Sequence, residues 1–224
     1  MEETPDQART LRLLVSSSTA RLPLKGHSSP ATPWVVPHKV LVVVGGRRGA
    51  GATTVARNLA ATATAHGVRA MHMGANAAVR PPRVSVDYFL VDPEDPLQAE
   101  GLADYLVLVA TPDEEGVRGV YVALKRFRST TPGLPAGVIL NRAGSPGNGA
   151  TLGARIASAA KAFIFGPDLD VLGWILEDAE SVALDSMRRP FSVARPGSAA
   201  AAGVRLCARR LWSRWPRRWK VIAA

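Results

Sequence analysis

The first residues with a chemical pattern lie in a short glycine-rich stretch, GRRGAGATT, between an apolar run and a helical segment. Gly46, Gly49 and Gly51 allow successive main-chain amides to curl around an oxyanion, and the helix that follows adds its positive end. A hydroxyl from Thr53 or Thr54 can then reach a magnesium ion. This stretch has the composition of a phosphate-binding loop.

The same loop lacks the cation that phosphoryl transfer requires. Against the pattern G-x-x-x-x-G-K-[ST], residues 46–53 place Ala52 at the lysine position. That lysine normally reaches the β- and γ-phosphates and neutralises charge in the transition state. Losing a preorganised cation costs several kcal/mol, which is many powers of ten in rate. The loop therefore predicts a degenerate catalytic site, and it leaves open whether ATP or ADP with Mg²⁺ is still bound weakly.

Apolar runs and helical stretches alternate along residues 39–202, which we expect to form the globular domain. Continuous apolar runs are typical of strands buried on both faces of a parallel sheet, and they lie at 40–44, 88–91, 105–110, 137–140 and 171–175. One further strand is expected around Val68 to Met73. Helical stretches separate the strands at 53–65, 115–129, 151–163 and 178–188. This alternation predicts an α/β fold with a doubly wound, mostly parallel sheet flanked by helices.

Composition narrows the classes of function. One cysteine, Cys207, excludes an internal disulfide, and four scattered histidines give no metal-ligand spacing. The chain has neither a signal-like start nor an apolar run of membrane-spanning length, so we expect a cytoplasmic protein. A net charge of +10 indicates a polyanionic partner, either a membrane surface or nucleic acid.

At this point the globular part resembles the MinD/ParA-type ATPases, P-loop proteins whose deviant Walker motif reads G-K-G-G-x-G-K-[ST]-[ST]. The loop residues that match are Gly46, Gly49, Gly51, Thr53 and Thr54. Arg47 stands where the family's signature lysine falls. The resemblance implies that Asp92, at the end of YFLVD, is the Walker B aspartate and that Asn141, in GVILNR, contacts adenine.

The departures from this family all concern catalysis. Both lysines are absent, and no carboxylate occurs between Ala52 and Asp87, where the family carries the aspartate that positions the attacking water. We therefore expect ATPase activity to be lost. The competing interpretation is an ATP-hydrolysing dimeric switch at the membrane that has found substitutes for its lysines, and the sequence leaves homodimerisation open. A third interpretation is a ParA-like protein that binds DNA without sequence specificity.

The amino-terminal segment, residues 1–15, is expected to form a short helix ahead of a Ser- and Pro-rich linker at 16–38. Thr4 and Gln7 fit a capping box, so an ordinary capped helix is one interpretation. The segment also resembles the D-Q-A-x-x-L-R start of the flagellar branch of the family, FlhG, YlxH or FleN. The matching residues are Asp6, Gln7, Ala8, Leu11 and Arg12. The resemblance implies a partner, an FlhF-like GTPase, whose active site Gln7 helps to complete.

The carboxy-terminal segment, residues 203–224, contains seven basic residues and no acidic one. An apolar helical face opposite a cationic one is typical of a helix lying in an anionic membrane interface. The predicted membrane-binding residues are Leu211, Trp212, Trp215, Trp219 and Ile222, with Arg210, Arg214 and Arg218. Packing of the tryptophans on the protein body is the alternative, and nucleic-acid binding is less favoured. The favoured interpretation places the protein peripherally on the inner face of the plasma membrane.

Overall fold

The computed structural model describes residues 39–74, 86–99 and 101–214. Its strands are β1 (Lys39–Gly45), β2 (Ala70–Gly74), β3 (Tyr88–Asp92), β4 (Tyr105–Ala110), β5 (Ala136–Ala143) and β6 (Leu169–Leu176). Its longer helices are α2 (Ala52–Ala65), α3 (Glu114–Thr130), α4 (Pro146–Phe163), α5 (Ala179–Ser186) and α7 (Ala199–Trp212). A 3₁₀ turn η1 (Pro96–Ala99) and a short helix α6 (Phe191–Ala194) complete the described elements.

The six strands form one parallel sheet in the order β2-β3-β1-β4-β5-β6. The chain crosses from one side of β1 to the other between β3 and β4, and such switch points open a crevice at the carboxyl ends of the strands. The phosphate-binding loop leaves β1 at this point. The predicted fold class is therefore confirmed, and the predicted strands and helices occur within a few residues of their expected bounds.

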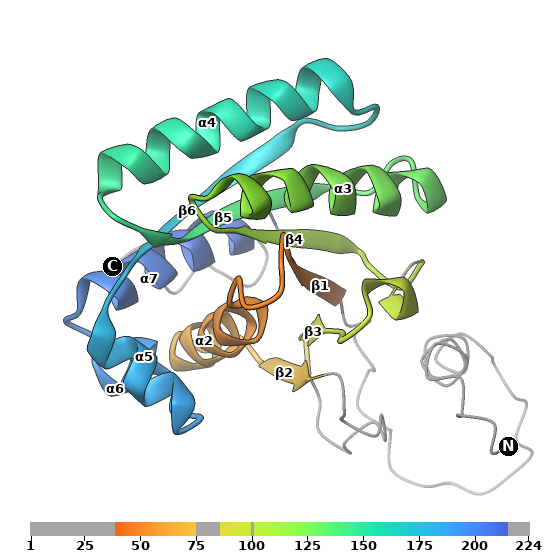
Figure 1. The fold of residues 1–224 in the computed structure, drawn as a ribbon. Coiled ribbons are helices and arrows are strands. Elements are labelled where there is room, and N and C mark those ends of the chain that lie inside the picture. The colour runs from red at the N-terminus through yellow and green to blue at the C-terminus, as the bar shows by residue number, and fades with distance from the viewer. Residues whose placement is uncertain (1–38, 75–85, 100, 215–224) are drawn as a thin grey trace, which may run out of the picture.

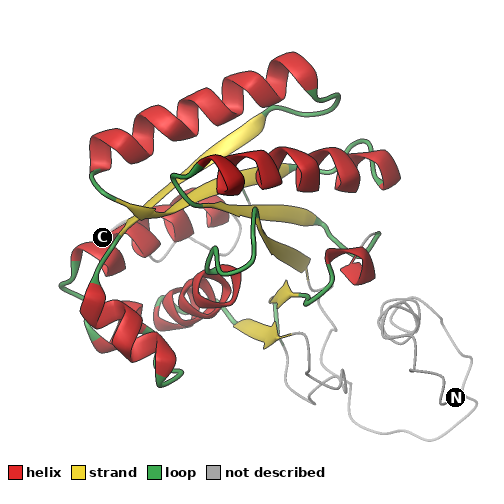
Figure 2. Cartoon of the chain, in the orientation of Figure 1, coloured by secondary structure: helices red, strands yellow, loops and turns green. Residues whose placement is uncertain are grey.

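Helices cover the sheet on two faces, as Figures 1 and 2 show. On one face α3 and α4 pack over side chains such as Val42, Leu108 and Val138. On the other face α2 and α7 pack over a second cluster that includes Leu41 and Val107. Alternate residues of one strand therefore enter different cores, which explains why the strands read as unbroken apolar runs.

Helix α7 corrects the prediction for the carboxy-terminal segment. Leu211 and Trp212, expected on a lipid-facing surface, are 0% and 1% exposed and belong to the core on the α2 side of the sheet. The Trp212 ring lies 4.7 Å from that of Tyr88, measured between centroids. Packing against α2 and β6 therefore buries the first half of the predicted membrane face, and the domain continues past Ala202 to at least the end of α7.

Two of the predicted lipid-binding arginines also bind to the domain. Arg210 donates a hydrogen bond to the main-chain oxygen of Val171 at 3.1 Å. Arg214 forms an ion pair with Asp170 and lies over the ring of Tyr105, 5.6 Å from its centroid. Burial and the neighbouring charge of Asp170 raise the pKa of Tyr105, so its hydroxyl stays protonated and donates to that carboxylate at 3.0 Å. These contacts fix the position of Arg214, the last described residue.

Several predictions fall on residues outside the described ranges. They are the amino-terminal helix at 1–15 with Asp6, Gln7, Ala8, Leu11 and Arg12, the linker at 16–38, and the tail residues Trp215, Arg218, Trp219 and Ile222. Within the described ranges, no helix is long and apolar enough to cross a membrane.

Candidate nucleotide-binding site

The loop between β1 and α2 is shaped to present main-chain amides. Gly49 and Gly51 adopt φ angles of 75° and 92°, which favour glycine. Gly46 lies so close to α3 that an added Cβ would stand 2.1 Å from the main-chain oxygen of Gly116. Two of the loop glycines are therefore needed for backbone conformation, and Gly46 for close approach to the neighbouring helix.

The start of α2 differs from that of the other long helices described. Asp113, Ser145, Asp178 and Ser198 cap α3, α4, α5 and α7 with side-chain oxygens that accept main-chain hydrogen bonds. At α2 the N-cap is Gly51, which has no side chain to accept one, and the first turn contains no acidic residue. The amide groups at this end suit an external anion, and the helix dipole favours it.

Asp92, the expected Walker B aspartate, and Thr53, one of the two threonines expected to offer a hydroxyl to magnesium, come together where β3 ends and α2 begins. The Thr53 hydroxyl donates to one Asp92 carboxylate oxygen at 2.5 Å. The other oxygen lies 2.5 Å from Nε2 of His72, on β2. Asp92 is 7% exposed, so groups of the chain itself hold both of its oxygens in a largely buried position.

His72 is a residue that sequence reasoning missed. It lies on β2, two residues before that strand ends, in the region where the resemblance leads one to expect a carboxylate. Imidazole can share a proton with Asp92, but it does not place a second carboxylate beside the phosphate loop. The arrangement thus replaces the expected negative charge with a hydrogen-bonding ring.

Arg47, at the signature lysine position, is held by its own chain. Its Nε donates to the Thr111 hydroxyl at 3.1 Å and lies 3.2 Å from the Asp113 carboxylate. Hydrogen bonds from the Thr111 hydroxyl and the Gly116 amide, and the charge of Arg47, lower the pKa of Asp113. Arg47 therefore ties the loop to the start of α3, and this contact competes with any contact to a phosphate.

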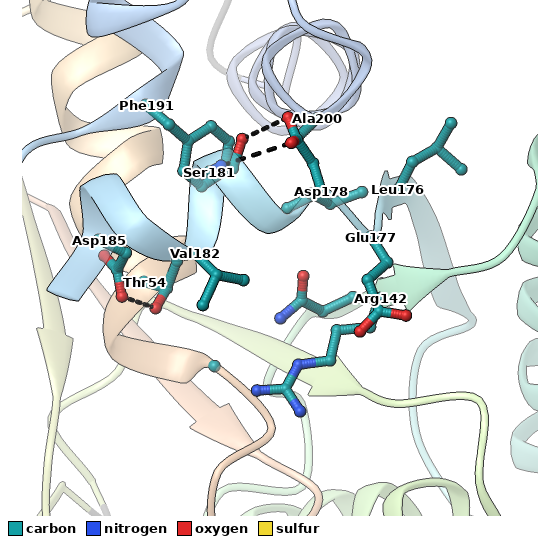
Figure 3. A pocket seen from close by; sticks show the side chains of 13 residues that line it. Thr54, Arg142, Leu176, Glu177, Asp178, Ser181, Val182, Asp185, Phe191 and Ala200 are labelled. Carbon is teal, nitrogen blue, oxygen red and sulfur yellow. Dashed lines mark hydrogen bonds between the residues drawn. The ribbon is translucent and has the colours of Figure 1, made fainter.

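The other end of the site is a small pocket of about 90 Å³ between the loop and α5. Asn141, the predicted adenine contact, lines it and donates from Nδ2 to the main-chain oxygen of Ala50 at 2.9 Å. The Thr54 hydroxyl and the Asp185 carboxylate point toward one another from α2 and α5, 2.5 Å apart (Figure 3). Arg57 pairs with the same carboxylate at 2.6 Å. Thr54 thus fastens α5 to α2.

A larger cleft of about 1200 Å³ runs over the loop and carries an excess of positive charge. Its lining includes five arginines, namely Arg47, Arg48, Arg57, Arg142 and Arg188. Arg142 and Arg188 have φ angles of 58° and 57°, and they are the two non-glycine residues with positive φ among those described. Strained backbone of this kind clusters at functional sites. The sequence gives no signal for either, because the strain depends on the irregular end of β5, where Arg142 lies, and on the turn after α5, where Arg188 lies.

Solved structures with this architecture include MinD and ParA ATPases. The chain is similar to the MinD cell division protein of Aquifex aeolicus, with a TM-score of 0.63 and 18% identity over 78% of this chain and 97% of that one. It is also similar to the septum site-determining protein MinD of Pyrococcus horikoshii OT3, a complex with Mg-ADP, with a TM-score of 0.57 and 17% identity, covering 78% and 96%. A ParA family ATPase of Chlorobium tepidum gives a TM-score of 0.54 and 13% identity, covering 79% and 97%.

The fold is that of the MinD and ParA ATPases. No family model matches the sequence, and no curated protein matches it.

A magnesium nucleotide fits some of these residues and not others. The uncapped start of α2 and the cationic cleft suit phosphate groups, and Thr53 with Asp92 offers two oxygens to a magnesium ion. Within the described ranges no three His, Cys, Asp or Glu side chains gather at a metal-binding distance, so Mg²⁺ would depend on phosphate oxygens as further ligands. Nucleotide would supply those oxygens; Ala52 adds no charge to hold them.

Proposed function

We propose that this protein is a MinD/ParA-type regulatory scaffold that binds ATP or ADP weakly and has lost the ability to hydrolyse ATP. The observation that carries the proposal is the state of Asp92, whose two carboxylate oxygens are held by Thr53 and His72. Ala52 at the lysine position and the absence of a carboxylate from the β2 segment support it further.

These substitutions act on different parts of the reaction. A magnesium ion must displace the Thr53 hydrogen bond to reach Asp92, which weakens metal binding. Without a lysine the charge that develops on the transferred phosphoryl group is not neutralised, and without the β2 carboxylate the attacking water is not oriented. Each loss reduces the rate separately, so no single replacement restores turnover.

Nucleotide titration and phosphate release test this proposal. We expect measurable ATP and ADP binding and no Mg²⁺-dependent phosphate release above the buffer rate. Magnesium-dependent turnover that Asp92→Asn abolishes would contradict the proposal and favour the alternative, a dimeric switch whose cleft arginines replace the lysines. The replacement Ala52→Lys, which supplies a cation to the phosphate groups, is expected to tighten ATP binding, and Ala52→Met, which adds length without charge, is its matched control.

The regulatory target in this proposal is an FlhF-like GTPase, bound through residues 1–15. The support is the resemblance of Asp6, Gln7, Ala8, Leu11 and Arg12 to the start of the flagellar branch. A glutamine delivered by a tethered helix orients an attacking water, as activating glutamines do in other GTPases. A regulator of this kind needs no turnover of its own.

The GTPase rate of a purified FlhF-like protein, measured with a peptide of residues 1–20, tests that target. We expect stimulation by the native peptide and none by the peptide with Gln7→Ala, because the glutamine supplies the chemistry. Equal stimulation by both peptides would assign the effect to docking alone, and no stimulation by either would remove this partner.

Peripheral attachment to an anionic membrane remains part of the proposal, in a shorter form than the sequence suggested. Trp215, Arg218, Trp219 and Ile222 follow the last described residue, and the segment 215–224 contains three basic residues and no acidic one. Such a segment is attracted to anionic lipid by its charge and retained by its tryptophans. Duplex DNA is the competing polyanion, and co-sedimentation with vesicles or with DNA separates the two.

A further inference from the structure

Two phenylalanines protrude from the domain at the end of α4. Phe163 and Phe165 are 86% and 99% exposed, the highest values among the exposed large apolar side chains of the described residues. Ile164, between them, packs against the core under α3 and α4, and its amide closes the helix by donating to the Ala160 oxygen at 2.8 Å. The partly buried isoleucine therefore fixes a turn that directs its two neighbours outward.

The segment after these phenylalanines is held firmly. Arg128, which is 5% exposed, donates from its guanidinium to the Pro167 main-chain oxygen at 2.5 Å. Gly166 has a φ angle of 124°, and its position against the Arg128 side chain leaves no room for a larger residue without adjustment. The two rings therefore protrude from a turn whose main chain is held in place by these contacts.

Basic residues lie at the same edge of the sheet as this turn. Lys161 lies two residues before Phe163 and pairs with Asp168. The Nζ–Oδ2 distance is 3.2 Å, and both side chains are largely exposed. Lys125 lies near the end of α3, and Arg209 and Arg210 lie near the end of α7. The carboxyl ends of α3 and α4 on one face of the sheet, and of α7 on the other face, all lie at the edge where the strands begin, and each has basic residues near its partial negative charge.

Residue 214, the last described one, lies at the same edge of the sheet. Arg214 pairs with Asp170, at the start of β6, and only five positions separate Asp170 from Phe165. An extended chain covers at most about 3.5 Å per residue, so the main chains of Phe165 and Asp170 lie within roughly 20 Å of one another. Arg214, after which the basic, tryptophan-containing segment 215–224 follows in the sequence, therefore lies at the same edge of the sheet as the protruding phenylalanines.

We propose that Phe163 and Phe165 form a second membrane contact, inserting into an anionic lipid surface next to the carboxy-terminal segment. Exposed aromatic rings within a cationic rim match the interfacial region of a bilayer, where rings enter the headgroup boundary and cations contact anionic headgroups. Binding to nucleic acid uses the cations but leaves two fully exposed apolar rings unexplained. This inference deepens the membrane attachment proposed above and rests on it.

The geometry also sets the orientation of the docked domain. The phenylalanine turn lies where the strands begin, and the phosphate loop lies at the opposite edge, where they end. Docking through the turn leaves the nucleotide cleft facing away from the membrane, accessible to nucleotide and partner.

Sedimentation of the full-length protein with vesicles tests the contact. Vesicles contain phosphatidylglycerol and phosphatidylethanolamine, and vesicles of phosphatidylcholine serve as the uncharged comparison. The double variant Phe163→Ser with Phe165→Ser is expected to lower the partition coefficient on anionic vesicles on the order of tenfold or more. Met187→Ser with Val193→Ser, which removes two other exposed apolar side chains, is the matched control and is expected to bind like the unaltered protein.

A truncated protein of residues 1–214 separates this inference from the attachment on which it rests. Loss of binding on truncation, with no effect of the phenylalanine variant, keeps the tail contact and overturns the inference. Failure of the unaltered protein to bind anionic vesicles, or its preference for duplex DNA, overturns both membrane contacts and leaves the GTPase assay to judge the partner.

A fluorescent label at the turn reports insertion directly. Phe165→Cys introduces an accessible thiol, while the native Cys207 is fully buried and burial raises its pKa to about 12, so it does not react. A nitrobenzoxadiazole label at position 165 is expected to shift its emission to shorter wavelength on anionic vesicles. Unchanged emission from vesicle-bound protein would show that the turn stays in water, which overturns the inference.

Discussion

Replacing Trp212 by alanine tests whether this residue stabilises the core or binds lipid. The ring is 1% exposed and lies 4.7 Å from the Tyr88 ring, within the cluster that joins α7 and α2 to the sheet. Removing a buried tryptophan loses its transfer free energy and leaves a cavity, at a cost of about 3–5 kcal/mol. That loss is a large fraction of the stability of an ordinary domain, typically about 5–15 kcal/mol.

Urea unfolding followed by circular dichroism measures this loss. With a slope of about 2–3 kcal/mol per molar urea, the midpoint is expected to fall by roughly 1–2 M with little change in slope. Phe165→Ala is the matched aromatic control; because that ring is 99% exposed, its free energy of unfolding is expected to change by less than about 0.5 kcal/mol.

Two results would refute the reasoning about α7. The first is a Trp212→Ala midpoint equal to that of the Phe165→Ala control. The second is a stable Trp212→Ala protein that loses affinity for anionic vesicles, which would return the residue to the lipid-facing surface that the sequence alone suggested.

Three further predictions follow from the described contacts. The lowered pKa of Asp113 means that its stabilising effect is present above the unfolded pKa and is lost as pH falls through the folded value, so Asp113→Asn flattens the acid side of a stability–pH profile. Cys207 is expected to resist Ellman's reagent at pH 8 until the protein unfolds, and rapid reaction of the native protein would contradict its burial. Gly51→Ala places a Cβ 2.4 Å from Nδ2 of Asn141 at positive φ. Calorimetry should therefore show a stability lower by about 1–3 kcal/mol, and nucleotide binding should be weaker. Gly67→Ala is the control, because it has the same backbone strain but its added Cβ meets no neighbouring atom.

The fold was predictable because its strands are buried on both faces. Burial on both sides removes the alternation of polar and apolar residues, so runs such as VLVVV indicate a parallel sheet directly. The glycine loop was predictable for a similar reason, since positive φ at Gly49 and Gly51 restricts the residue type. Both signals come from residues that are neighbours in the chain, so they can be recognised from the sequence alone.

The unpredicted parts of the site depend on contacts between distant segments. Thr54 and Asp185 are separated by 131 positions, and His72 meets Asp92 across neighbouring strands. A helical face gives a related ambiguity. The spacing of Leu211 and Trp212 identifies an apolar face correctly, but the spacing is the same whether lipid or the protein core covers it. Only the position of α7 against β6 and α2 decides between the two.

Helix α7 connects the two ends of the molecule that we propose to be functional. Its partner α2 begins at the phosphate loop with Gly51, and the two helices share one core. The last described residue after α7, Arg214, is bound to Asp170 at the opposite edge of the sheet, next to the phenylalanine turn. Close-packed cores transmit displacement because they have few alternative arrangements. A nucleotide that moves α2 must therefore either move α7, and with it the start of the tail, or give up buried contacts.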